Sequence, residues 1–204
     1  MSTAPPITAV TVYCSSSSAI PPVYREAAAE LGQAIARTGW KLVYGGNNIG
    51  SMGVLANAVR AAGGKVIGIT PQLFIDKGLA DNDCEELIIA DSMRHRKALM
   101  EQRGDAFVTL PGGLGTFEEI FEIIVGKQLR YHSKPIVLLN ISGYFQPLLQ
   151  MIEHGIEEKF IKPHARRLYH VASSVADGID HILTYEPAPP GDKWFEHAVP
   201  SGAE

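Results

Sequence analysis

Residues 106–121, AFVTLPGGLGTFEEIF, place three different patterns next to one another. Residues 106–110 are a short apolar run with the length of a buried strand. The glycine-rich stretch PGGLGT follows directly, and apolar residues then recur at helical spacing at Phe117, Ile120, Phe121 and Ile124. The stretch predicts a strand, a tight turn and the start of a helix, which is the repeating unit of a parallel α/β sheet.

The same order of strand and helix recurs along the chain. Further strands are expected at residues 7–13, 41–44, 66–70, 87–90 and 136–139, with a weaker candidate at 169–172. One of the intervening helical patterns begins at Pro21-Pro22 and ends before Gly39. We expect an α/β fold, a doubly wound and mostly parallel Rossmann-like sheet with helices on both faces. A single domain is expected over residues 1–185, followed by a proline-rich C-terminal tail over 186–204.

The composition argues against several classes of partner. Lys and Arg total 18 against 22 Asp and Glu, and no block is rich in basic residues, so no nucleic-acid partner is expected. No apolar run approaches the roughly 18 residues of a membrane span, so we expect no membrane partner and a cytoplasmic location. Cys14 and Cys84 are too few for a disulfide framework, and the seven histidines lack metal-ligand spacing. No metal is expected.

The glycine-rich turn at residues 111–116 is suited to bind an anion. Glycines let the backbone approach a phosphate closely, and the first N–H groups of a helix have no partner within it. The alternative is a tight turn whose glycines serve only positive φ angles. Glu118 stands where a dinucleotide fingerprint has its third glycine, and Ser51-Met52 stand where a P-loop has Lys-Ser/Thr. Neither NAD nor a nucleoside triphosphate is indicated.

Charged residues surround this turn. Glu118 and Glu119 follow it, and the sequence MRHRK at residues 93–97 supplies Arg96 and Lys97 early in the preceding helix. If neighbouring strand ends bring Arg96 and Glu119 into one cleft, the pair forms a catalytic arrangement beside a phosphate site. Two other interpretations stay open. Thr116-x-x-Glu119 fits a capping box, and the basic cluster fits a solvated helix face.

Arg96-Lys97 followed by PGGLGTFEE at residues 111–119 resembles the PGGxGTxxE signature of the LONELY GUY (LOG) family, also labelled possible lysine decarboxylase. VYCSS at 12–16, YGG at 44–46 and KPIVLLN at 134–140 support the resemblance, which covers residues 10–183. It implies hydrolysis of the N-glycosidic bond of a cytokinin riboside 5'-monophosphate. The products are the free base and ribose 5-phosphate, and no cofactor is implied.

The resemblance also assigns roles to residues. Glu119 and Arg96 correspond to the catalytic pair. The residues that would surround the nucleotide are Met93, Lys97, Gly112, Gly113, Gly115, Thr116, Glu118, Gly45 and Gly46. The chemistry agrees, because glycosidic cleavage develops positive charge on the sugar, which a nearby carboxylate stabilises. Departures from the family pattern bear on the base pocket and the oligomer surface; they are Ser15, Ser51, Arg94 and Val125-Gly126.

Two other functions stay open beside this one. The enzyme could act on ordinary purine or pyrimidine 5'-monophosphates in nucleotide salvage, or the same fold could serve as a non-catalytic carrier of a nucleotide-like cofactor. A pyridoxal phosphate decarboxylase is disfavoured, because it needs a Schiff-base lysine with a partner for the ring nitrogen, and Lys97 is the only lysine near the motif. The partner expected for the site is a nucleoside 5'-monophosphate.

A homodimer or higher homo-oligomer is expected, chiefly from the resemblance. The helix predicted over residues 117–129 carries apolar side chains over a wider arc than one sheet can cover. The additional apolar face favours a second copy of the chain as its partner.

Overall fold

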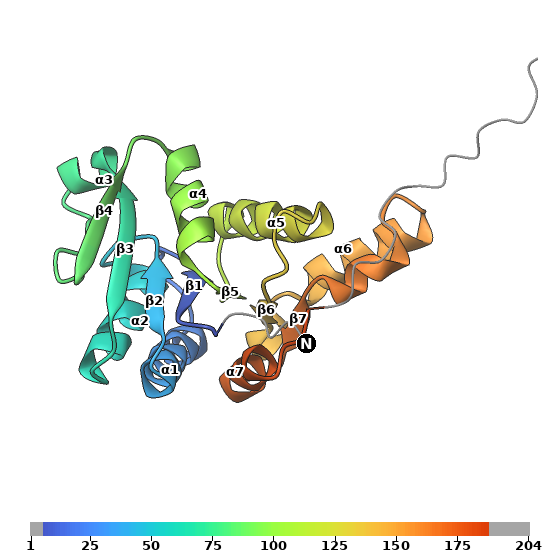
Figure 1. Ribbon diagram of the computed structural model, residues 1–204, viewed down its shortest axis with the longest axis horizontal. Coiled ribbons are helices and arrows are strands. Elements are labelled where there is room, and N and C mark those ends of the chain that lie inside the picture. The colour runs from blue at the N-terminus through green and yellow to red at the C-terminus, as the bar shows by residue number, and fades with distance from the viewer. Residues whose placement is uncertain (1–5, 188–204) are drawn as a thin grey trace, which may run out of the picture.

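The computed structural model describes residues 6–187, which form one seven-stranded parallel sheet covered by helices (Figure 1). The strand order is β4-β3-β2-β1-β5-β6-β7. The strands are β1 (Ala9–Tyr13), β2 (Lys41–Tyr44), β3 (Val66–Pro71), β4 (Glu86–Ala90), β5 (Ala106–Thr109), β6 (Ile136–Leu139) and β7 (His170–Ala172). The helices are α1 (Pro22–Thr38), α2 (Gly50–Ala61), α3 (Gln72–Asp76), α4 (Met93–Arg103), α5 (Leu114–Gln128), α6 (Gln146–Glu157) and α7 (Val175–Leu183).

The central strands β1, β5 and β6 are buried along their whole length. They read as continuous apolar runs because helices cover both of their faces. Helices α1, α2 and α7 pack on one face, and α4, α5 and α6 on the other (Figure 1). The doubly wound fold expected from the sequence is confirmed, and every strand of the sheet is parallel to its neighbours.

The chain changes direction across the sheet at β1. Strands β2, β3 and β4 lie on one side of β1, and β5, β6 and β7 on the other. Tyr13 of β1 pairs with Thr109 of β5, so the loops that follow these strands leave the sheet side by side. In doubly wound sheets, ligands bind in the crevice at this position.

One helix start differs from the sequence-based expectation. Helix α5 begins at Leu114, three residues before the expected Phe117. Residues 188–204 of the expected C-terminal tail lie outside the described residues. Within residues 6–187, no helix is long and apolar enough to cross a membrane.

Candidate active site

The N-terminus of α5 presents unpaired backbone donors beside open space. The first helical hydrogen bond runs from the Phe117 N–H to the Gly113 carbonyl, 3.0 Å away, so the preceding N–H groups have no partner within the helix. Gly112, Gly113 and Gly115 all lack positive φ angles. A Cβ built on Gly113 or Gly115 would meet no atom within 4 Å. The interpretation that positive φ angles require these glycines is therefore wrong, and Gly113 and Gly115 both border open space.

Gly112 is a glycine for a different reason. A Cβ there would lie 2.1 Å from the Oγ1 atom of Thr116, which folds back over the turn. Thr116 is buried and is the third residue of α5, because Gly113 is the N-cap. The alternative interpretation as a capping box is therefore wrong, since Thr116 lies inside the helix and the Glu119 side chain has a different partner.

That partner is Arg96, whose guanidinium is held by three acceptors. Its Nε donates to the Ile69 carbonyl at 3.0 Å, Nη2 to the Gly45 carbonyl at 3.2 Å, and Nη1 to Glu119 Oε1 at 3.1 Å. Arg96 is only 3% exposed. The solvated helix face proposed for the basic cluster is therefore wrong for Arg96, although Arg94 and His95 are exposed.

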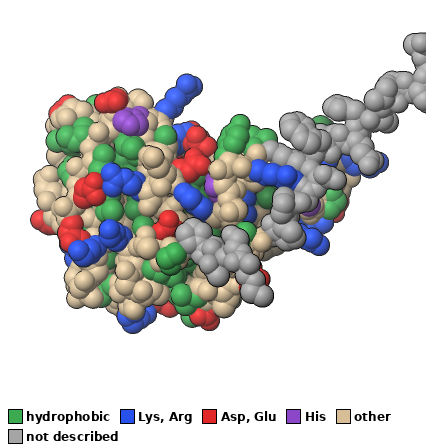
Figure 2. Space-filling view, in the orientation of Figure 1, with side chains coloured by type: hydrophobic (Ala, Val, Ile, Leu, Met, Phe, Trp, Pro, Cys, Tyr) green, Lys and Arg blue, Asp and Glu red, His purple; other side chains and the backbone are tan. Residues whose placement is uncertain are grey.

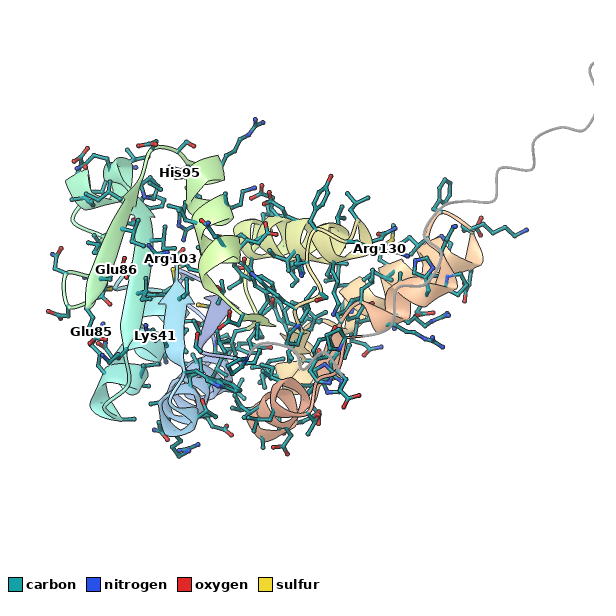
Figure 3. The ribbon with its side chains drawn as sticks, viewed as in Figure 1. Lys41, Glu85, Glu86, His95, Arg103 and Arg130 are labelled. Carbon is teal, nitrogen blue, oxygen red and sulfur yellow. The ribbon has the colours of Figure 1, made fainter. Side chains whose placement is uncertain are left out.

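The local sequence explains how α4 directs Arg96 inward. Ser92 caps the helix by accepting from the His95 N–H at 3.1 Å, which fixes where α4 begins. At the other end, Arg103 pairs with Glu86 of β4 at 3.1 Å, and both side chains are labelled in Figure 3. A Cβ on Gly45 would lie 1.9 Å from Arg96 Nη2, so a glycine at this position makes room for the guanidinium.

Glu119 is 7% exposed and lies at the inner face of α5. Burial raises the pKa of its carboxyl above the ordinary value; Arg96 opposes this shift, and the charge of Glu118 adds to it. Only Oε1 contacts Arg96, and Oε2 has no hydrogen-bond partner among residues 6–187. One oxygen of the carboxylate is therefore available for water or substrate.

Lys97 and Glu118 form a second, more exposed group. Lys97 Nζ contacts Glu118 and also Glu122, the latter at 2.8 Å. These hydrogen bonds raise the pKa of Lys97. Acidic and basic side chains accordingly lie side by side on the surface over α4 and α5 (Figure 2). Met93 is half exposed at the start of α4, and Gly46 has a φ of 69° in the loop after β2.

A cavity of about 280 Å³ adjoins the glycine-rich turn. Its polar lining comes from Ser15 and Ser17 in the loop after β1 and from the Gly112 and Gly113 backbone, and aromatic rings complete the wall. The ring residues are Tyr24 and Tyr144. The site residues assigned from the family resemblance included neither of these serines and neither of these tyrosines. Only the position of the serine loop at the end of a strand could have indicated the serines.

No group of three or more potential metal ligands occurs among residues 6–187. The described part of the site is built from one buried ion pair, the α5 N-terminus and the adjoining cavity.

Comparisons with known proteins place this chain among sequence relatives with a common name. A family model described as "Possible lysine decarboxylase" matches residues 52–182. A cytokinin riboside 5'-monophosphate phosphoribohydrolase of Rhodococcoides fascians is 43% identical over 174 residues, covering 85% of this chain and 88% of that protein. The protein of the same name from Mycobacterium tuberculosis is 40% identical, and the match covers 83% of this chain and 90% of that protein. Arabidopsis thaliana LOG5, also given that name, is 40% identical, and the match covers 89% of this chain and 80% of that protein.

Solved structures share the fold. The molybdenum cofactor carrier protein of Chlamydomonas reinhardtii has a TM-score of 0.66 at 24% identity, covering 86% of this chain and 96% of that chain. At that identity the likeness concerns the fold alone. The X-ray structure of the structural-genomics target TM1055 also has a TM-score of 0.66, at 25% identity, and the match covers 87% of this chain and 99% of that chain.

Proposed function

Since the chain belongs to the family of cytokinin riboside 5'-monophosphate phosphoribohydrolases, we propose that it hydrolyses the N-glycosidic bond of a nucleoside 5'-monophosphate. The products are the free base and ribose 5-phosphate, and the proposed reaction uses no cofactor. The observation that carries the proposal is the buried Arg96–Glu119 pair beside the unpaired N-terminus of α5.

The spacing along α5 fits a nucleotide. A phosphate at the N-terminus would be bound by backbone N–H groups of residues 113–116 and favoured by the helix dipole. Glu119 lies five residues beyond Leu114, which corresponds to about 7.5 Å along the helix axis at 1.5 Å per residue. That separation suits a ribose 5-phosphate, whose phosphate and anomeric carbon lie at opposite ends.

The proposed chemistry assigns separate tasks to the two buried residues. Water adds to the anomeric carbon as the bond to the base breaks, and the electron pair leaves with the base, which takes up a proton. Glu119 stabilises the positive charge that develops on the sugar and accepts a proton from the attacking water. Arg96 directly contacts Glu119, and its charge opposes the rise in the carboxyl pKa, which keeps more of Glu119 ionised.

The remaining site residues receive proposed roles by position. Gly112, Gly113, Gly115 and Thr116 would surround the phosphate, with Met93, Lys97 and Glu118 at the more exposed side of the nucleotide. Gly45 leaves room for the Arg96 guanidinium, and Gly46 adopts the positive φ angle of the adjacent turn. We therefore assign these two glycines a supporting role rather than direct contact with the substrate.

We also propose a homodimer and a cytoplasmic location. Helix α5 and its C-cap residue carry a row of exposed apolar side chains, namely Leu114, Phe121, Val125 and Leu129, at 86%, 39%, 45% and 41% exposure. Hydrophobic side chains are visible on the surface above α5 (Figure 2). A second copy covering this row would also lie next to the α5 N-terminus. Free thiols at Cys14 and Cys84 suit a reducing compartment.

Base release distinguishes the proposal from its alternatives. Purified protein is incubated with isopentenyladenosine monophosphate and, separately, with AMP, and the free base is measured by chromatography. Faster release from the prenylated nucleotide is expected for a cytokinin enzyme, and comparable rates would indicate a salvage nucleosidase. Binding without base release from either nucleotide would indicate a carrier, and Glu119→Gln provides the matched inactive control.

A further inference from the structure

Tyr144 lies at the wall of the cavity, on a segment far from the glycine-rich turn in sequence. It follows the short 3₁₀ turn at Ile141–Gly143, which comes directly after β6. Asn140 fixes the end of this turn, because its Oδ1 accepts from the Phe145 N–H at 2.7 Å. The Tyr144 backbone is therefore anchored independently of the loop that its side chain contacts.

The phenol of Tyr144 donates a hydrogen bond to the Gly112 carbonyl at 2.5 Å. Aromatic neighbours hold its ring in place: Tyr24 at 5.6 Å between ring centroids, Phe145 at 5.2 Å and Phe117 at 6.5 Å. The donor is thus presented by a ring that has little freedom to move away.

This hydrogen bond orients the peptide group between Gly112 and Gly113. In a trans peptide the carbonyl and the N–H point in opposite directions, so anchoring the Gly112 carbonyl directs the Gly113 N–H away from the phenol. That N–H has no hydrogen-bond partner among residues 6–187, and Gly113 itself is exposed and lines the cavity. A carbonyl that accepts a hydrogen bond also makes the N–H of its own peptide a stronger donor.

Two consecutive glycines would otherwise leave this peptide free to rotate, since neither residue has a Cβ to restrict it. Anchoring the peptide before the ligand arrives reduces the ordering cost of binding. We propose that Tyr144 is a positioning residue that presets the Gly112–Gly113 peptide to receive the substrate phosphate. This inference rests on the proposed function only in taking a 5'-phosphate as the group that binds at the turn.

Tyr144→Phe tests the inference, because it removes the hydroxyl and keeps the ring that packs on Tyr24, Phe117 and Phe145. The dissociation constant for inorganic phosphate, measured by calorimetry, and the KM for a nucleoside 5'-monophosphate should each rise about tenfold. We expect kcat to stay within about twofold, since Tyr144 acts through binding. Inhibition by the matching nucleoside, which lacks the phosphate, should not change.

Two further variants separate the hydroxyl from the ring. Tyr144→Leu should weaken phosphate binding at least as much as Tyr144→Phe. Tyr185→Phe removes a hydroxyl that has no described hydrogen bond and lies outside the cavity lining, and it should bind phosphate like the original protein. A change only in melting temperature, or a Tyr144→Phe chain that does not fold, would give the hydroxyl a purely structural role and overturn the inference.

The test also separates this inference from the proposed function. Unchanged phosphate binding and KM in Tyr144→Phe, in a protein that hydrolyses nucleotides, would refute the role of Tyr144 and leave the function standing. Weaker phosphate binding in Tyr144→Phe, in a protein that releases no base, would support the role of Tyr144 and refute the hydrolase. An original protein that binds no phosphate would overturn the inference directly.

Discussion

Replacing Glu119 by Gln tests the catalytic assignment with little change of shape. The amide oxygen of Gln can still accept from Arg96, and Arg96 keeps the Ile69 and Gly45 carbonyls as acceptors. The substitution therefore removes the negative charge and preserves the hydrogen-bond pattern. Because Glu119 closes no capping box, its loss does not expose the end of α5.

Glu119→Gln should change the free energy of unfolding and kcat by different amounts. Deleting one partner of a buried ion pair costs about 3–5 kcal/mol, and a retained acceptor should bring the cost down to about 1–3 kcal/mol. Removing a group that stabilises transition-state charge should lower kcat by about 10² or more, equivalent to about 2.7 kcal/mol. Binding of the nucleotide should change little.

The pH dependence gives an independent measurement on the same variant. Burial raises the Glu119 pKa in the folded state above its ordinary value. Glu119 therefore makes its full contribution to the free energy of unfolding below about pH 4.3, its pKa in the unfolded chain. That contribution is lost as pH rises through the higher pKa of the folded state. The stability advantage of the original protein over Glu119→Gln, measured by urea unfolding, should therefore narrow as pH rises across this window.

Activity should show the opposite trend. The ionised carboxylate is the active form, so kcat/KM should rise with pH through the raised pKa of Glu119. Near-normal kcat in Glu119→Gln, with intact folding by circular dichroism, would refute the catalytic role of Glu119 and favour Glu118 as the catalytic carboxylate.

Four further outcomes are expected. Arg96→Ala should lower unfolding free energy by about 3–5 kcal/mol in urea titrations and lower turnover, because Glu119 and two carbonyls lose their buried donor; unchanged stability would contradict the buried network. A nucleoside should be cleaved at least about 100-fold less efficiently than its 5'-monophosphate, since the α5 N-terminus contributes binding only with an anion, and equal rates would refute the phosphate site. Light scattering should give twice the chain mass of 22.1 kDa, and Val125→Glu should produce monomers by placing a charge in the apolar row; a monomeric original protein would refute the dimer. EDTA should leave activity unchanged, and loss of activity that added metal restores would reveal a missed site.

The central strands β1, β5 and β6 could be predicted from sequence because burial on both faces makes them continuous apolar runs. The strands β2 and β6 have the expected bounds. The surroundings of Arg96 could not be predicted in this way, because its acceptors come from β3, the loop after β2 and α5, whose contacts exist only in the folded sheet. The contact of Tyr144 with Gly112 could not be predicted from the sequence either, since the two residues are 32 positions apart.

The ambiguity at Glu119 depended on where α5 begins. A helix starting near Phe117 would make Thr116 an N-cap and Glu119 its capping partner, whereas a helix starting at Leu114 places both inside. The structure has the earlier start, and the buried positions of α5 then include Thr116, Glu119, Ile120 and Ile123 at helical spacing. Glu119 then occupies a core-facing position, where an ionised side chain is costly unless it is paired. A carboxylate on the core-facing side of a helix therefore indicates a buried cation nearby, but the sequence alone could not place Glu119 there, because its apolar pattern begins only at Phe117.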